Sequence, residues 1–186
     1  MKRLCSVILC LMISMLFFSI KTSFAKNFPL YRYGENQFVK EVSYWGSNIN
    51  LKFGKGVYKT EKSKAGILRF YEFQFGSDNM NNLALGIKKD NIIDEIIISF
   101  PIQGKKTKEG MSTIGQGMSA LICTLYTIGF KESEIESFLQ TVQQDLKNAG
   151  NRDYYEKNYK LSRNVLGDQI DIEMFIEESQ VIYWIE

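Results

Sequence analysis

The residue types that most enzymes use for acid–base or nucleophilic chemistry are scarce in this chain of 186 residues. It contains no histidine and three cysteines, of which Cys5 and Cys10 lie near the N-terminus. Histidine is the usual general base, the usual activator of a nucleophilic serine or cysteine, and the commonest metal ligand. A Ser–His–Asp or Cys–His arrangement within the chain is therefore impossible, and a zinc site is disfavoured because its N and S ligands are missing. We expect no cofactor, and we assign no catalytic, cofactor-binding or metal-binding residue.

The third cysteine, Cys123, stands among apolar residues, with Leu121 and Ile122 before it and Leu125 after it. A reactive thiol or an intermolecular disulfide would be the functional interpretation. A free cysteine in such a segment is more often a small buried hydrophobe. No neighbouring base that would lower the pKa of the thiol is evident. We therefore expect Cys123 to be a core residue.

Carboxylates offer the remaining route to catalysis, because two of them can act as acid and base in glycoside hydrolysis. Such a hydrolase requires two carboxylates about 5–10 Å apart in one cleft, at least one with a raised pKa. Several carboxylates can also bind calcium, but none of the clusters has the spacing of a known calcium loop. Asp171 and Glu173 alternate with apolar residues, as on the solvated face of a strand. The clusters are Asp90, Asp94 and Glu95; Asp168, Asp171 and Glu173; and Glu177 with Glu178.

Glycines and aromatic residues supply two weaker candidates. Gly110, Gly115 and Gly117 could be taken for a phosphate-binding loop, but the lysine of a P-loop and the third glycine of a dinucleotide turn are missing. We expect Gly115, four residues before Ser119, to form a shallow groove that lets a helix pack tightly.

The abundant aromatic residues are expected mostly in the core and at sheet edges. Tyr154 and Tyr155, beside Arg152 and Lys157, are a candidate recognition surface, since Tyr and Arg are enriched in binding hot spots.

The N-terminus has the three parts of a secretory signal. Lys2 and Arg3 precede an apolar run over residues 4–20, and Ser23 and Ala25 are small residues at the −3 and −1 positions of a cut after residue 25. The pattern predicts a cleaved signal peptide over residues 1–25 and a single secreted domain over residues 26–186. The expected location is secreted or periplasmic, with no transmembrane segment after cleavage. An uncleaved membrane anchor is the alternative.

Cleavage changes the charge and the disulfide chemistry that the chain can use. Three basic residues and no acidic ones leave with the signal, so 23 Lys and Arg become 20 against 21 Asp and Glu. The lack of net positive charge argues against nucleic acid as a partner. One cysteine remains, so an intramolecular disulfide is impossible and the core must hold the domain together.

Hydrophobic periodicity predicts strands, then helices, then strands again. Strands are expected over residues 37–45, 49–53, 57–60, 67–75, 83–88 and 92–102, with a solvated loop over 59–64. Apolar residues at three- and four-residue steps predict a helix over about 111–128 that ends at Gly129. A second helix is expected between Ser133, with Glu136 as its capping-box partner, and Gly150. Further strands are expected over 159–165, 170–176 and 181–185.

This order predicts the α+β class, an antiparallel β-sheet in which a strand run, a two-helix insertion and a C-terminal β-meander follow one another. The helices should pack on one face, and the other face should be polar and wet.

The sequence favours a small exported binding module without enzymatic activity, whose partner is a protein or an envelope component. One alternative is a carrier of an apolar ligand in a cavity between the sheet and the first helix. That cavity would be lined by Met111, Ile114, Met118 and Leu121, opposite Ile96 and Ile98. The other alternative is a small envelope hydrolase that uses a carboxylate pair.

Overall fold

The computed structural model describes residues 30–31, 34–63, 66–77, 81–88, 91–102, 108–149, 154–163, 168–177 and 180–186. The proposed signal segment lies outside these residues. The described helices are α2 (Glu35–Ser47), α3 (Lys108–Thr127) and α4 (Glu132–Ala149). The strands are β1 (Val57–Ser63), β2 (Gly66–Gln74), β3 (Asn82–Ile87), β4 (Ile93–Pro101), β5 (Tyr154–Arg163), β6 (Asp168–Glu177) and β7 (Gln180–Ile185).

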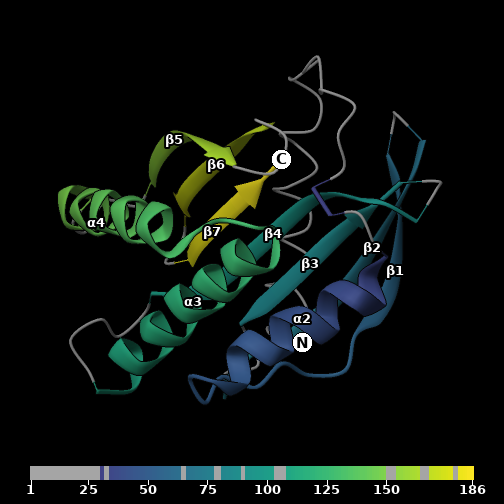
Figure 1. The fold of residues 1–186 in the computed structure, drawn as a ribbon, viewed down its shortest axis with the longest axis horizontal. Helices are drawn as coiled ribbons and strands as arrows, with labels where there is room; N and C mark the ends of the chain where they lie inside the picture. Colours follow the sequence, from purple (N-terminus) through teal and green to yellow (C-terminus); the bar gives the residue numbers. More distant parts are fainter. Residues whose placement is uncertain are drawn as a thin grey trace.

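All seven strands form one antiparallel sheet in the order β1-β2-β3-β4-β7-β6-β5 (Figure 1). The last strand, β7, pairs with β4 in the middle of the sheet, in the register Ile96↔Ile185 to Pro101↔Gln180. The C-terminal meander therefore extends the N-terminal four strands, and β5 becomes an outer strand. The α+β class predicted from the sequence is confirmed.

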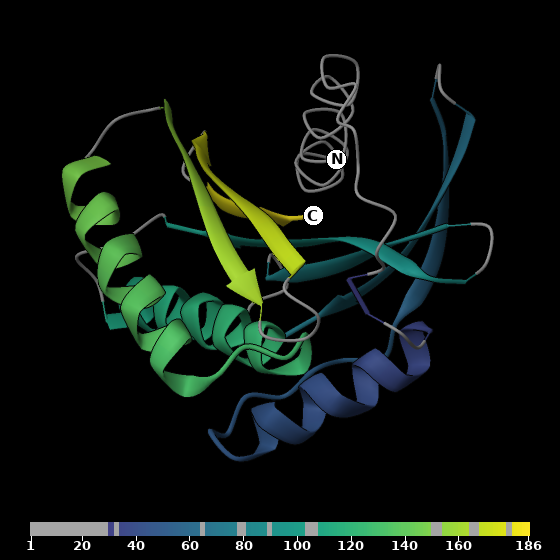
Figure 2. The same ribbon diagram turned by 45° about the horizontal axis from the view of Figure 1, so that its top comes forward.

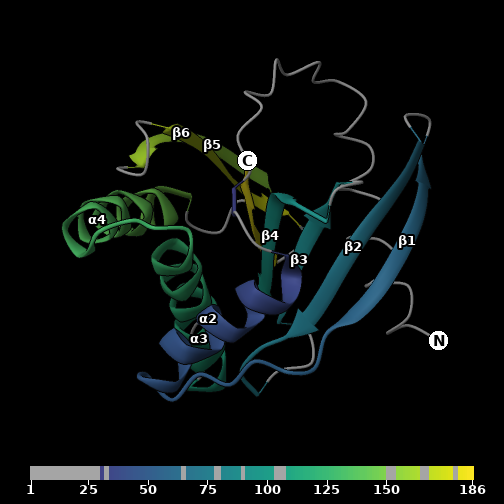
Figure 3. The ribbon, with the colours of Figure 1, turned by 45° about the vertical axis from the view of Figure 1, so that its right-hand side comes forward.

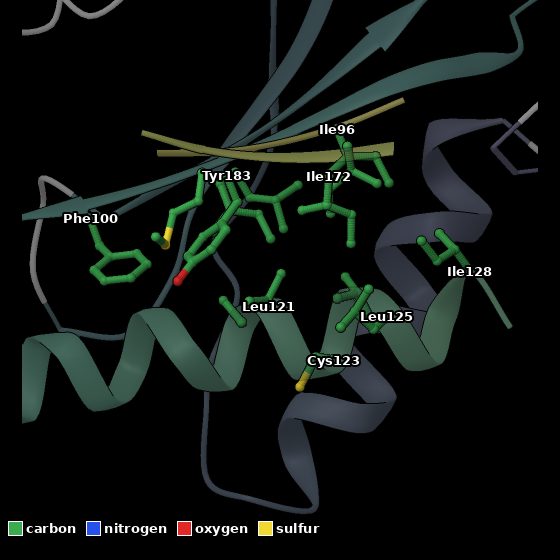
Figure 4. Close-up of a cluster of buried hydrophobic side chains, with 14 of the residues drawn as sticks. Ile96, Phe100, Leu121, Cys123, Leu125, Ile128, Ile172 and Tyr183 are labelled. Carbon is green, nitrogen blue, oxygen red and sulfur yellow. The ribbon is translucent and has the colours of Figure 1, made fainter. Parts of the chain in front are cut away.

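The three described helices lie on one face of the sheet (Figure 2). Helix α3 runs beneath the centre, and Leu121 and Leu125 point up from it toward Ile96 and Tyr183 (Figure 4). Cys123 points the other way, toward α2. These side chains belong to one continuous core cluster, so the three helices and the sheet share a single hydrophobic core.

Two of the predicted strands are absent, and helix α2 takes the place of the first. Residues 37–45 were expected to alternate as a strand, but Phe38, Val42 and Gly46 are buried at four-residue steps along one face of α2. Residues 48–50 form a turn after α2, and Phe53 makes only an isolated bridge with Phe75, so the strand expected over 49–53 is also wrong.

Two other local predictions need correction. The stretch over residues 59–64 that was expected as a loop belongs, over its described residues, to β1, the outer strand on the opposite edge from β5. Lys59 there forms an ion pair with Glu72 of β2. Helix α4 begins at Glu132, and the Lys131 backbone N–H donates to the Glu134 carboxylate at 2.7 Å. The reciprocal capping contact therefore lies two residues earlier than the one predicted for Ser133 and Glu136. Gly129 ends α3 with φ 99°, as expected.

On the face of the sheet turned away from the helices, the part at β4 and β7 is not the wet, polar surface that alternation predicted. Ile96 and Tyr183 point toward the helices, so their neighbours Glu95 and Trp184 point to the opposite face. Both are only 8 % exposed. Among the described residues no helix lies over this face (Figure 2). The polar character of Glu95 therefore did not predict that its side chain is buried.

Candidate functional site

Residues of α4 and of the outer strand β5 line an open groove. Figure 3 shows the course of the two elements. Its volume is about 650 Å³, within the usual range of ligand-binding clefts. The residues that line it are Phe130, Ser133, Glu134, Ser137, Phe138, Thr141, Asn158, Tyr159, Lys160, Leu161 and Ser162.

The floor of the groove is apolar and well packed. Phe138 of α4 meets Tyr159 of β5 edge to face, with ring centroids 5.1 Å apart. Both rings are buried, as is Phe130 in the loop before α4, and Leu161 is partly buried. A ligand side chain that entered the groove would therefore meet a preformed apolar surface.

The rim on the helix side is a row of small hydroxyl side chains. Ser133, Ser137 and Thr141 are four residues apart, so they lie one above the other on one face of α4. All three are exposed, and the Thr141 hydroxyl donates to the Ser137 carbonyl at 3.2 Å. Because these side chains are short, α4 leaves space beside β5 that longer side chains would fill.

The rim on the strand side is polar. Asn158, Lys160 and Ser162 line this side and are exposed, and they alternate with Tyr159 and Leu161, so their side chains point to the face of β5 turned away from the helices. Lys160 lies 3.8 Å from the Asp171 carboxylate on the neighbouring strand β6, with both side chains more than half exposed. This pair is a weak, solvent-screened contact on that outer face.

Buried hydrogen bonds fix α4 against β5. The Tyr159 hydroxyl donates to Asp145 of α4 at 2.7 Å, and the Tyr155 hydroxyl donates to the same carboxylate at 3.3 Å. Burial and, after it, the contact with Asp145 raise the pKa of Tyr159 far above its ordinary value, so the hydroxyl stays a donor. The two walls of the groove are therefore held in a fixed relation.

Strand β5 has a hydrogen-bonding edge that the described part of the sheet leaves open. It pairs with β6 in an unbroken register of ten residues, from Tyr154↔Glu177 to Arg163↔Asp168, and it is last in the strand order. An outer strand presents a row of N–H and C=O groups to its free side. Those groups border the groove.

Cys123 is a core residue, as its apolar neighbours predicted. It is 1 % exposed, and burial raises the pKa of its thiol to about 11. The thiol is neutral at physiological pH and is neither a nucleophile nor a metal ligand there.

Asp94 and Glu95 of the first carboxylate cluster are neighbours on β4. Asp94 binds Lys88 at 3.2 Å. Glu95 is the perturbed acid: burial, followed by the nearby charges of Asp94 and Glu186, raises its pKa to about 8. The charge of Lys88 and, after it, the neighbouring Trp184 side chain oppose that rise. Asp90 and Glu178 lie outside the described residues.

No group of three or more potential metal ligands occurs among the described residues. Asp171 is about half exposed beside Lys160. This matches the solvated strand face that its alternation predicted.

The glycines of α3 serve packing, but not through the residue pair expected. A Cβ atom at Gly117 would overlap the Phe100 ring of β4, whereas one at Gly115 would meet nothing within 4 Å. The close approach of α3 to the sheet therefore depends on Gly117, and the groove predicted for Gly115 and Ser119 is not used.

The tyrosine pair is divided between the surface and the groove wall. Tyr154 is 48 % exposed, and its hydroxyl donates to Glu156 at 2.6 Å. Tyr155 is partly buried against Asp145. Arg152 lies outside the described residues.

Of the residues named for an apolar carrier cavity, the Met111 side chain lies outside the described part of the structure, and the other five belong to the core or pack against it. Leu121, Ile96 and Ile98 are fully buried, with Ile114 and Met118 packed against them. The Tyr183 hydroxyl makes a 3.6 Å contact with the Met118 sulfur.

Sequence inspection missed the groove, although one signal for it exists. The four-residue spacing of Ser133, Ser137 and Thr141 marks a stripe of small polar side chains on an otherwise ordinary amphipathic helix. The stripe lines a groove because β5 lies beside it. The position of β5 cannot be predicted from the periodicity of α4.

No family model, curated protein or solved structure matches this chain. Among the described residues, no helix combines the length and apolar character that crossing a membrane requires.

Proposed function

We propose that this protein is an exported binding module that holds an extended segment of a partner protein in the groove between α4 and β5. The observation that carries the proposal is the open edge of β5 beside a groove with an apolar floor and a polar rim. A peptide that lies along such an edge adds a strand to the sheet. Its main chain would supply affinity, and alternate side chains would enter the groove beside Phe138 and Leu161.

Export is part of the same proposal and rests on the N-terminal pattern. A cut after Ala25 would release residues 26–186 beyond the cytoplasmic membrane. The mass and N-terminal sequence of the protein recovered from an exporting cell test this directly. A mature chain that begins at Lys26 supports it, and an intact Met1 in the exported fraction contradicts it.

The binding experiment compares wild type with a variant whose groove is filled. Ser137→Trp places a large ring at the middle of the helix-side rim, while Gln143→Trp places the same ring on an exposed part of α4 that does not line the groove. Both exported variants should show wild-type circular dichroism and thermal melting. Each is then used to capture partners from the native envelope fraction, and proteins and lipids are identified by mass spectrometry.

We expect wild type and Gln143→Trp to capture the same protein and Ser137→Trp to lose it. Equal capture by all three would remove the groove from the proposal. A co-purified lipid or other apolar molecule in place of a protein would favour the carrier hypothesis. Bond cleavage in an envelope polysaccharide, abolished by Glu95→Gln, would favour the hydrolase hypothesis.

A further inference from the structure

The open edge of β5 lacks two of the features that usually keep an outer strand from pairing with another chain. It contains no proline, and its register with β6 runs for ten residues without a bulge. Charged side chains also protect an edge, and β5 carries the exposed residues Glu156, Lys157 and Lys160, so pairing requires a register that places opposite charges together. We propose that, when no target is bound, β5 pairs antiparallel with β5 of a second copy of this chain, so that the two sheets become continuous. The inference rests on the proposed function, because it assigns an occupant to the same edge.

Symmetry restricts the registers that such a pair can adopt. Two copies joined edge to edge in an antiparallel sheet are related by a two-fold axis perpendicular to the sheet. In an antiparallel pair, two residues directly opposite each other point to the same face of the sheet. The axis must therefore pass beside one residue of β5, which then lies opposite the same residue of the second copy.

Charge selects one of these registers. With Asn158 on the axis, Glu156 lies opposite the partner's Lys160, and the same contact occurs twice. An axis at Glu156, Lys157 or Lys160 brings two like charges together. An axis at Tyr159 forms no opposite-charge pair. Of the registers compared, the one centred on Asn158 is therefore the register in which two copies of β5 have complementary charges.

Contacts within the chain already hold the two charged side chains of this register on the polar face of β5. The Tyr154 hydroxyl donates to Glu156 at 2.6 Å, and Lys160 lies 3.8 Å from Asp171. In the pair, Asp171, Lys160 and the partner's Glu156 would form a ladder of alternating charge across three strands. The partner's Tyr155 and Lys157 would point to the face that carries Tyr159 and the groove.

Self-association and target binding then exclude each other, because both use the β5 edge. The dimer would keep the edge covered until a target segment displaces the second copy. This explains how an exported protein with a long, regular edge strand can avoid open-ended aggregation, since a two-fold contact closes on itself.

A cysteine on the axis tests the register. In the exported protein, Asn158→Cys should form a disulfide-linked dimer under mild oxidation, because directly opposite residues have Cα atoms about 4.5–5.5 Å apart. Ser162→Cys is the matched control. Its two copies would lie eight residues apart along the strands, about 27 Å, and should not crosslink. Cys123 is buried and does not interfere. Equal crosslinking of both variants, or of neither, overturns the register.

Charge reversal provides the second test, measured as oligomeric mass by light scattering. Glu156→Lys and Lys160→Glu each create two like-charge pairs and should weaken dimerisation about tenfold or more. The double variant restores both opposite-charge pairs and should dimerise like wild type. A mixture of the two single variants should form heterodimers. Circular dichroism must show that each single variant is folded, since Lys160→Glu also faces Asp171.

The outcomes separate this inference from the proposed function. A wild-type protein that is monomeric at all concentrations, or a dimer indifferent to the charge reversals, overturns self-association at β5. If that monomer still captures a partner protein that Ser137→Trp loses, the proposed function stands without the dimer. A dimer that assembles as described while all groove variants capture equally supports the dimer and removes the groove.

Discussion

Replacing Glu95 with glutamine should stabilise the protein at neutral and alkaline pH, although it alters a buried polar residue. Glu95 is 8 % exposed, and burial, with the charges of Asp94 and Glu186, raises its pKa from 4.5 to about 8. The folded state therefore holds this carboxyl group protonated at a pH where the unfolded chain ionises it. Glutamine has nearly the same shape and no charge, so it keeps the packing and removes the titration.

The sign and size follow from proton linkage. A group with a raised pKa in the folded state contributes its full stability below pH 4.5 and loses it as the pH rises to about 8. Each pH unit between these values costs about 1.4 kcal/mol, which amounts to about 3 kcal/mol at pH 7 and about 5 kcal/mol above pH 8. The advantage of Glu95→Gln over wild type should therefore be constant below pH 4.5, grow between pH 4.5 and 8, and level off above pH 8.

Urea unfolding followed by circular dichroism at one-unit steps from pH 4 to pH 9 measures this difference. With an m-value of about 2 kcal/mol/M, the midpoint should move upward by roughly 1–3 M at pH 8. The exposed Gln143→Asn, which adds or removes no titrating group, is the control and should leave the pH dependence unchanged. Parallel stability curves for wild type and Glu95→Gln would refute the assignment of a raised pKa to this residue.

Three further outcomes follow from the packing of the core and groove walls. Gly117→Ala should lower the unfolding free energy by about 1–3 kcal/mol because its methyl group overlaps a phenylalanine ring of the sheet. Gly115→Ala, two residues earlier on the same helix but in open space, should be neutral or stabilising by up to about 1 kcal/mol in the same urea titration. Tyr159→Phe should cost about 1–3 kcal/mol by removing a buried donor to a carboxylate, while the exposed Tyr154→Phe should change stability by less than about 0.5 kcal/mol. An equal loss for both tyrosines would show that the buried hydrogen bond is not the cause. The Cys123 thiol should resist an aromatic disulfide reagent at pH 8 and react only in denaturant, and rapid reaction of native protein would contradict its burial.

Local periodicity was sufficient for the elements whose pattern has one interpretation. The apolar stripe of α3 and the alternation of Ile170, Ile172 and Met174 in β6 each fit one period, so both were predicted correctly. The spacing of Phe38 and Val42 fits both an alternating strand and one face of a helix. Packing of α2 beside α3 decided between them, and this contact joins segments about 80 residues apart.

The position of the candidate site depended on pairing between distant strands. Glu95 could be named as a candidate acid from the sequence, but its raised pKa depends on its burial in the sheet, where it packs over Gly86 of the neighbouring strand β3. The groove exists because the pairing of β7 with β4 sends β5 to the edge of the sheet, where the small side chains of α4 face it. Neither relation is visible in the spacing of neighbouring residues.

The sequence by itself determined the α+β class, the core role of Cys123 and the impossibility of histidine chemistry, because composition and local period are properties of the chain alone. Tertiary structure decided which carboxylate is buried, which glycine packs, and which strand keeps an open edge. These depend on strand order and on contacts between segments far apart in the sequence, where many arrangements satisfy the same local pattern and only the packed core selects one.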